Sequence, residues 1–126
     1  MQFTKKGTGA MKFNKIFLMG IALEILAAPA TATAGGSDYG YVKNVSMGNG
    51  GYFYFTVDSN RILPAPCATS YNGRWAFNAS TPAGQVLMAS ILTAYSSHIK
   101  IAVTGGGYCN TWPDSEDVAF IQYENN

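Results

Sequence analysis

One stretch of sequence decides the fold: Tyr39-Gly-Tyr-Val-Lys-Asn-Val-Ser-Met-Gly-Asn-Gly-Gly-Tyr-Phe-Tyr-Phe-Thr-Val-Asp58. In it, two runs of alternating side chains flank the glycine-rich segment Gly48-Asn49-Gly50-Gly51. An Asn-Gly pair between such runs is typical of the turn of a β-hairpin. The sequence therefore predicts strands at 39–47 and 52–58, joined by a tight turn.

The register of this hairpin follows from its turn. With Asn49 and Gly50 as the turn residues, the predicted facing pairs are Met47 with Tyr52, Val45 with Tyr54 and Lys43 with Thr56. Because side chains alternate between faces, one face carries Val42, Phe53, Phe55 and Val57, and we assign it to the core. The opposite face carries Tyr39, Tyr41, Lys43, Val45, Met47, Tyr52, Tyr54 and Thr56. Its four tyrosines are candidate ligand-binding residues.

The N-terminal 34 residues have the three parts of an export signal. Lys12 and Lys15 supply positive charge, residues 16–28 are mostly apolar, and Ala32-Thr33-Ala34 is a small-residue cleavage signal. We expect a signal peptide at 1–34, and Met11 begins a better one than Met1, so either methionine could be the true start. The apolar stretch is too short for a permanent membrane helix. The sequence predicts a secreted or periplasmic product without stable membrane insertion.

The expected product, residues 35–126, has 92 residues, enough for one domain. It carries four Lys and Arg residues and six Asp and Glu residues, which gives a net charge of −2. Binding to nucleic acid depends on neutralising phosphates with basic residues. A mildly acidic domain without a basic patch is therefore not expected to bind nucleic acid.

Two cysteines, Cys67 and Cys109, remain in this product and allow a single intramolecular bridge. Closing a loop of this length restricts the unfolded chain by roughly 4 kcal/mol on the entropic model. A redox role would require a close Cys-x-x-Cys pair, which the sequence lacks. We therefore predict a structural disulfide.

The remaining elements are one helix and three strands. Ser80 or Thr81 can cap a helix that starts near Pro82, and helical periodicity extends over 85–97. Strands are predicted at 74–78, 99–104 and 118–123, with a turn at Tyr71-Asn72-Gly73. This order favours a β-rich α+β domain, namely a five-stranded OB-type barrel with its helix between strands three and four. A two-layer sheet-plus-helix domain is the competing architecture.

The predicted helix has an unusual polar side. Its core side would carry Leu87, Met88, Ile91, Leu92, Ala94 and Tyr95. The other side carries small uncharged residues, although a surface helix usually shows Lys or Glu there. This side either packs on another copy of the chain or is a low-charge surface.

A family resemblance follows from several segments taken in order. They are Arg74-Trp75-Ala76-Phe77, Gly84-Gln85-Val86-Leu87-Met88, Leu92-Thr93-Ala94-Tyr95, Ile99-Lys100-Ile101-Ala102-Val103 and Gly107-Tyr108-Cys109. This pattern resembles small exported Gram-negative proteins related to the B subunit of subtilase cytotoxin. The resemblance implies an OB-fold subunit that forms a ring, commonly a pentamer, and binds host glycans. Relatives that bind sialylated sugars use a serine after a tyrosine in the first strand, whereas Gly40 follows Tyr39 here.

Catalytic and metal-binding patterns are weak in this sequence. His98 is the single histidine and lies where it can cap the helix, and no Cys or His cluster suits zinc. The acidic run Asp114, Glu116 and Asp117 could form a carboxylate pair or a calcium loop, but a solvated loop explains it better. The glycine triplet at 105–107 opens no helix, so it is no phosphate-binding loop. We expect no cofactor, no metal and no enzyme.

A second group of candidate ligand-binding residues lies in one loop. It comprises Asn110, Thr111, Trp112 and Asp114, which combine an aromatic ring with hydrogen-bonding groups beside Cys109. The leading hypothesis is an exported, non-enzymatic module that recognises carbohydrate as a homo-oligomer. The alternatives are a stand-alone structural or inhibitor protein that binds a protein partner through its tyrosines, and a small hydrolase that uses the acidic loop.

Overall fold

A computed structural model of the chain describes residues 33–69 and 73–125. Nearly all of the predicted signal peptide lies outside these ranges, as do Tyr71 and Asn72 of the predicted turn. Within the described residues, no helix is both long and apolar enough to cross a membrane.

The predicted hairpin forms, but its turn is longer than predicted. Strand β2 (Val42–Met47) pairs antiparallel with β3 (Tyr52–Val57), and Met47 faces Phe53, not Tyr52. Gly48 N–H donates to the Tyr52 carbonyl at 2.8 Å, which leaves Asn49, Gly50 and Gly51 in the turn. Both turn glycines have positive φ, a conformation that glycine adopts without strain.

A β-bulge restores the predicted register farther along the hairpin. Lys43 faces Thr56 as predicted, and the shift in pairing lies between Lys43 and Ser46. Asn44 takes the extra position with φ of 49°, in the left-handed region that asparagine tolerates. The bulge also moves Val45 to the core, where it packs against buried residues, so its predicted outward position is wrong.

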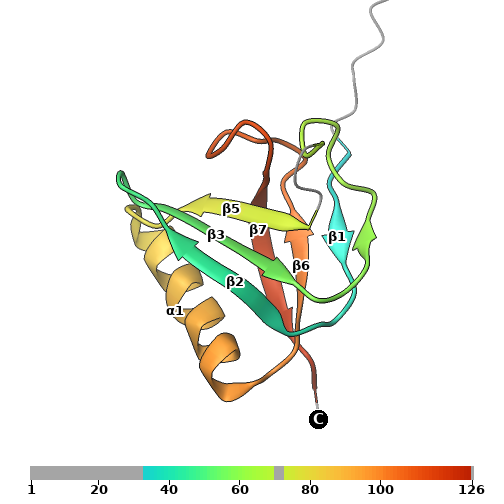
Figure 1. The fold of residues 1–126 in the computed structure, drawn as a ribbon, viewed down its shortest axis with the longest axis vertical. Helices are drawn as coiled ribbons and strands as arrows, with labels where there is room; N and C mark the ends of the chain where they lie inside the picture. Colours follow the sequence, from blue (N-terminus) through green and yellow to red (C-terminus); the bar gives the residue numbers. More distant parts are fainter. Residues whose placement is uncertain (1–32, 70–72, 126) are drawn as a thin grey trace, which may run out of the picture.

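The strands form one curled mixed sheet (Figure 1). Its order is β2-β3-β5-β7-β6-β1-β4. The further strands are β1 (Gly36–Ser37), β4 (Arg61–Ile62), β5 (Arg74–Asn78), β6 (Ile101–Gly105) and β7 (Glu116–Tyr123). In the described residues β5 and β7 run parallel and the other pairs antiparallel. The result is a β-rich, half-barrel α+β domain, which confirms the broad fold class.

The described residues contain seven strands, so the predicted count of five is wrong. One added strand, β1, lies before Tyr39, where the first predicted strand begins. Gly36 pairs with Ile62 and Thr104 in β1, the chain then bends, and Gly40 bridges Ile101 of β6 before β2 begins. The two-residue strand β4 is the other addition.

Helix α1 (Pro82–Ser97) starts and ends where its capping residues predict. Thr81 Oγ1 accepts a 3.0 Å hydrogen bond from Gly84 N–H, and His98 forms the C-cap in the left-handed conformation. Leu92 and Tyr95 were expected on the core side, but they are exposed, which narrows the buried stripe of the helix. Because α1 contacts both β2 and β7, it covers one end of the curl.

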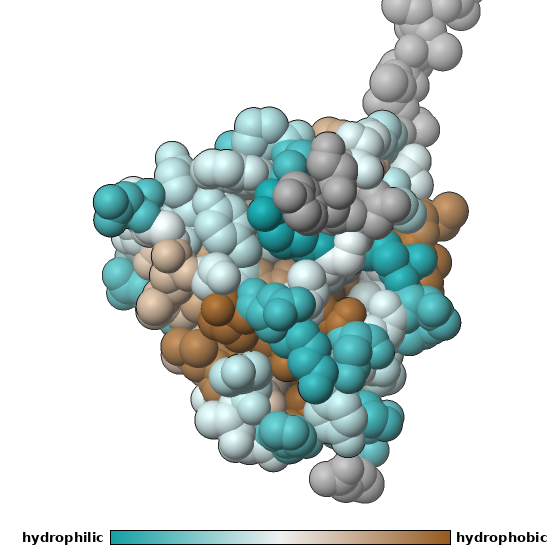
Figure 2. Space-filling view, in the orientation of Figure 1, coloured by the Kyte–Doolittle hydropathy of each residue, from teal (hydrophilic) through white to brown (hydrophobic). Residues whose placement is uncertain are grey.

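The core fills the concave side of the curled sheet. Its buried side chains are Val42, Phe53, Phe55, Val57, Trp75, Phe77, Ile91, Ala94, Ile101 and Val103. All four hairpin residues assigned to the core are among them, which confirms the alternation argument. The face seen in Figure 2 is mixed, with apolar residues gathered toward the side on which α1 lies and a smaller apolar group at the opposite edge.

Candidate functional site

Three predicted aromatic residues meet on the outer face of the sheet. The ring of Trp112 lies in T-shaped contact with Tyr54 and with Tyr52, at centroid distances of 5.4 and 6.0 Å. Trp112 remains 38% exposed, so part of its ring is available to a ligand. The structure therefore joins the predicted tyrosine face to the predicted Trp112 loop.

The loop before β7 reaches this position by crossing a strand. Trp112 precedes β7, whereas Tyr54 belongs to β3, and β5 lies between these two strands. Ala76 of β5, which faces Tyr54 across the sheet, is fully buried although its neighbours Trp75 and Phe77 point to the core. The outer face of β5 is thus covered, as the crossing loop requires.

An ion pair lies beside the aromatic residues. Arg74 Nη2 contacts Asp114 Oδ1 at 2.5 Å, and Arg74 Nε donates to Ser115 Oγ at 2.7 Å. The guanidinium lies 5.3 Å from the centre of the Tyr54 ring, within the range of a cation–π interaction. Arg74 thereby connects the loop to β3, although no sequence pattern marked it as a candidate site residue.

The charges in this group have clear electrostatic causes. Partial burial would raise the pKa of Asp114, but hydrogen bonds from Ser115 and Arg74 hold it below its usual value. Burial raises the pKa of the Tyr54 phenol, although Arg74 partly opposes that rise. At neutral pH the site therefore presents a carboxylate, a guanidinium and a neutral phenol.

The Trp112 loop is held in place at several points. The disulfide Cys67–Cys109, with Cα atoms 6.1 Å apart, confirms the predicted bridge and fixes the start of the loop. The Asp117 carboxylate accepts the Thr111 N–H at 3.0 Å, and Ser115 N–H donates to the Trp112 carbonyl at 3.2 Å. A loop held in this way loses little conformational entropy when it binds a ligand. Asn110 is exposed at its edge.

A shallow cavity of about 340 Å³ adjoins the aromatic residues. It is lined by Asn44, Ser46, Tyr54, Thr56, Gly73 and Arg74. Amide, hydroxyl and guanidinium groups therefore surround one aromatic ring. We name Tyr52, Tyr54, Arg74, Trp112 and Asp114, with this cavity, the aromatic site.

Tyr39 and Tyr41 lie apart from the aromatic site, at the hairpin end away from the turn. The ring of Tyr41 is 5.6 Å from that of His98, and the Nζ atoms of Lys43 and Lys100 lie 5.9 and 5.7 Å from it. Tyr41 lines a separate hollow of about 440 Å³ next to the end of α1. Tyr39 is 43% exposed. The structure thus divides the predicted tyrosine face into two parts.

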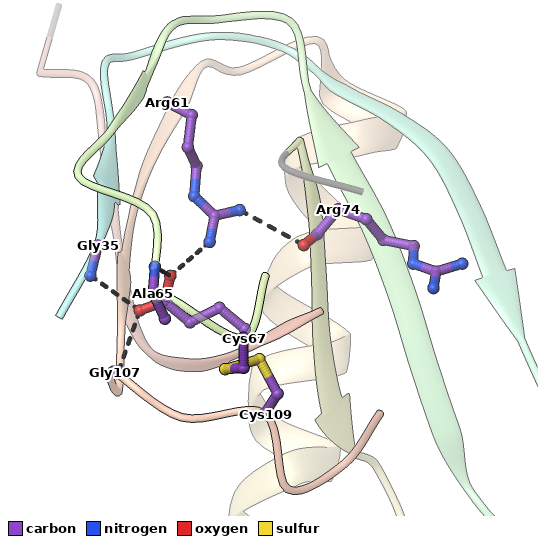
Figure 3. A network of polar contacts seen from close by, with 8 residues as sticks. Gly35, Arg61, Ala65, Cys67, Arg74, Gly107 and Cys109 are labelled. Atoms are coloured by element: carbon purple, nitrogen blue, oxygen red, sulfur yellow. Dashed lines mark hydrogen bonds and ion pairs between the residues drawn. A yellow bond between two sulfur atoms is a disulfide. The ribbon is translucent and has the colours of Figure 1, made fainter. Parts of the chain in front are cut away.

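The acidic run is not a solvated loop, and that interpretation is wrong for two of its members. Glu116 is fully buried and Asp117 nearly so. The Glu116 carboxylate accepts backbone N–H groups of Gly35, Ala65 and Gly107 at 2.8 to 3.0 Å and pairs with Arg61, as Figure 3 shows. Asp114 alone keeps partial exposure.

The pKa values of these buried groups are shifted in different directions. Burial alone would raise the pKa of Glu116, but the donors around it, Gly35 N–H foremost, hold it below its usual value. Burial raises the pKa of Asp117, only partly offset by the Thr111 N–H. Burial also lowers the pKa of Arg61, whose guanidinium lies 3.4 Å from the centre of the Trp75 ring. Glu116 is thus a fixed internal charge.

Among residues 33–69 and 73–125, no three His, Cys, Asp or Glu side chains are grouped to hold a metal ion. The aromatic site instead offers ring surfaces and fixed polar groups, which suit an uncharged polar ligand with an apolar face. Comparison with family models, curated proteins and solved structures gives no match to this chain.

Proposed function

We propose that this chain is an exported, non-enzymatic module that recognises carbohydrate as a homo-oligomer. The contact of Trp112 with Tyr52 and Tyr54, beside the Arg74–Asp114 pair, carries the proposal. A sugar ring has an apolar face that stacks on aromatic rings and hydroxyls that take directed hydrogen bonds. The aromatic site combines these two features on a preorganised loop.

The strand order supports an OB-type barrel as the finer architecture. If β1 and β2 are two halves of one bent strand and β4 is an addition, five strands remain, with α1 between the third and fourth. Oligosaccharides bind such barrels on the second and third strands and the loops beside them. In the proposed barrel, β3, β5 and the Trp112 loop would take those places.

The surface of α1 supports the homo-oligomer. Residues 82–97 contain no Lys, Arg, Asp or Glu, and Val86, Leu92 and Tyr95 are exposed on the helix. A second copy would cover these apolar groups, as in the rings of the B subunits that the sequence resembles. Kinship with those subunits is part of the proposal.

Export is supported by two features. The Cys67–Cys109 disulfide indicates an oxidising compartment outside the cytoplasm. The charged, apolar and small-residue parts of 1–34 follow the order of a signal peptide. The proposed product is therefore residues 35–126, in the periplasm or secreted.

Glycan-array screening of the exported product tests this function. We expect selective binding that Trp112→Ala abolishes and Tyr39→Ala, a similarly exposed aromatic residue outside the site, retains. No binding across the array would refute carbohydrate recognition. Size-exclusion chromatography with light scattering tests the assembly, and a strictly monomeric product would favour the stand-alone module that binds a protein partner.

A further inference from the structure

The described chain changes from exposed to buried at the bond where cleavage is expected. Thr33 and Ala34 are exposed, whereas Gly35 is buried. Gly35 N donates to Glu116 Oε1 at 2.8 Å, and the Gly35 carbonyl accepts from Gly105 N–H at 2.8 Å. The nitrogen that cleavage would release is therefore already docked on a buried carboxylate.

We propose that Glu116 is a receptor site for the α-ammonium group of Gly35, which is created when the leader is removed. Hydrolysis of the Ala34–Gly35 bond by a signal peptidase consumes one water molecule and leaves a carboxylate on Ala34. The released amine of Gly35 takes up a proton from solvent. A neutral N–H donor then becomes a charged donor to the same oxygen, and charged donors make stronger hydrogen bonds.

The surroundings of Glu116 accept such a charge. Its Oε1 accepts from Gly35 and Gly107, while Oε2 accepts from Arg61 and Ala65, so the carboxylate has four donors from three segments of the chain (Figure 3). Arg61 neutralises it in the uncleaved chain. The new ammonium would raise the net charge of the Glu116–Arg61 pair from zero to +1, and the carboxylate would lie between the two cations.

The first position of the product fits only glycine. A Cβ on Gly35 would stand 2.6 Å from Glu116 Oε2 and 2.8 Å from the Leu63 carbonyl oxygen. Gly105 is under a similar constraint, because a Cβ on it would stand 2.1 Å from Glu116 Oε1. The glycine after the cleavage signal thus lets the nitrogen reach the carboxylate.

This inference rests on the proposed export and not on carbohydrate binding. The first test is therefore to export the full chain and determine the N-terminal residue of the product by sequencing and intact mass. We expect Gly35. A folded product that starts at another residue overturns the inference and leaves the aromatic site unaffected.

The second test compares products that begin at Gly35 and at Ala34. The longer product keeps the Gly35 N–H but moves the charge one residue outward, where Ala34 is exposed. We expect the Gly35 product to unfold at a higher urea concentration, and Glu116→Gln to remove this difference. Equal midpoints for the two products would overturn the inference.

A labelling measurement keeps the inference testable if Glu116→Gln does not fold. An amine-selective acylating reagent near neutral pH should modify the α-amine of the folded Gly35 product about tenfold more slowly than that of the Ala34 product, because the paired ammonium is held by charged hydrogen bonds. The two products should react equally in denaturant. Equal rates in the folded state would contradict a docked N-terminus.

Discussion

The ring of Trp112 contacts the ring of Tyr54 in a T-shaped arrangement, with their centroids 5.4 Å apart. Trp112 comes from the loop before β7 and Tyr54 from β3, so the contact spans the outer face of the sheet. It brings candidate ligand-binding groups together without forming part of the core, because Trp112 keeps 38% of its surface exposed. Replacing Trp112 should therefore weaken ligand binding without a large loss in the free energy of unfolding.

The two tryptophans of the chain should differ in their effect on stability. Trp75 is 1% exposed, so Trp75→Ala should lower the free energy of unfolding by about 3–5 kcal/mol. Trp112→Ala should lower it by less, about 1–3 kcal/mol, because only its contacts with Tyr52 and Tyr54 and the burial of part of one ring are lost. Urea denaturation measures both, and equal losses would mean that Trp112 is a core residue.

Glu116 and Asp117 should affect acid stability in opposite directions. The pKa of Glu116 is lowered by folding, so its contribution is present above about pH 4.3 and is lost as the pH falls through the folded-state pKa. The pKa of Asp117 is raised by folding, so its ionised carboxylate lowers the free energy of unfolding at neutral pH. This cost is removed as the pH falls through the folded-state pKa. The two carboxyl groups therefore partly offset each other in acid.

Substitution separates these two contributions. Between pH 7 and pH 3, Glu116→Gln should reduce the loss of stability and Asp117→Asn should increase it, relative to the parent protein. Urea midpoints at the two pH values are the measurement, since the pH slope is independent of any constant cost of the substitution. Slopes that change in the same direction would contradict the assigned shifts.

The disulfide should stabilise both the fold and the binding loop. It joins residues 42 positions apart, so its loss should cost about 4 kcal/mol on the entropic model. A Cys67→Ser, Cys109→Ser double variant should unfold at a lower temperature than the oxidised parent protein, and it should bind ligand more weakly because Cys109 anchors the Trp112 loop. Reductant is the control, because it should change the parent and not the variant. An unchanged unfolding temperature in the variant would refute this role.

Replacing Gly84 with alanine should destabilise the protein, although helices usually favour alanine over glycine. Alanine normally stabilises a helix by about 1 kcal/mol over glycine. At Gly84, however, a Cβ would stand 1.9 Å from the Asn78 carbonyl oxygen, so Gly84→Ala should cost about 1–3 kcal/mol through forced displacement. Ala83→Gly, at the exposed neighbouring position, is the matched control and should cost about 1 kcal/mol. A rise in melting temperature for Gly84→Ala would show that the contact is relaxed.

Features with local signals could be predicted from the sequence. Alternation identified the core side of the hairpin, and Thr81 with Pro82 located the start of α1. The bulge at Asn44 could not be foreseen, because it compensates for a turn that has one residue more than the Asn-Gly pair indicates. Strands β1 and β4 have two residues each, which is too few for any periodic pattern.

The missed parts of the site depend on contacts between distant residues. Glu116 resembled a solvated acid because its partners Gly35, Arg61 and Ala65 are 81, 55 and 51 residues away. Likewise, Arg74 enters the aromatic site through Asp114 and Ser115, about 40 residues farther along the chain. The sequence could supply Trp112, Tyr52 and Tyr54 as candidates, but their meeting depends on how the loop crosses β5.

Intrinsic tryptophan fluorescence tests the central claim, carbohydrate binding at Trp112, most directly. Soluble oligosaccharides chosen from the glycan array would be titrated into the exported product and into Trp112→Phe. We predict a saturable change in the emission of the parent protein and none in Trp112→Phe, whose remaining tryptophan, Trp75, is buried. An equal change in both proteins, or no change with any sugar, would contradict the account.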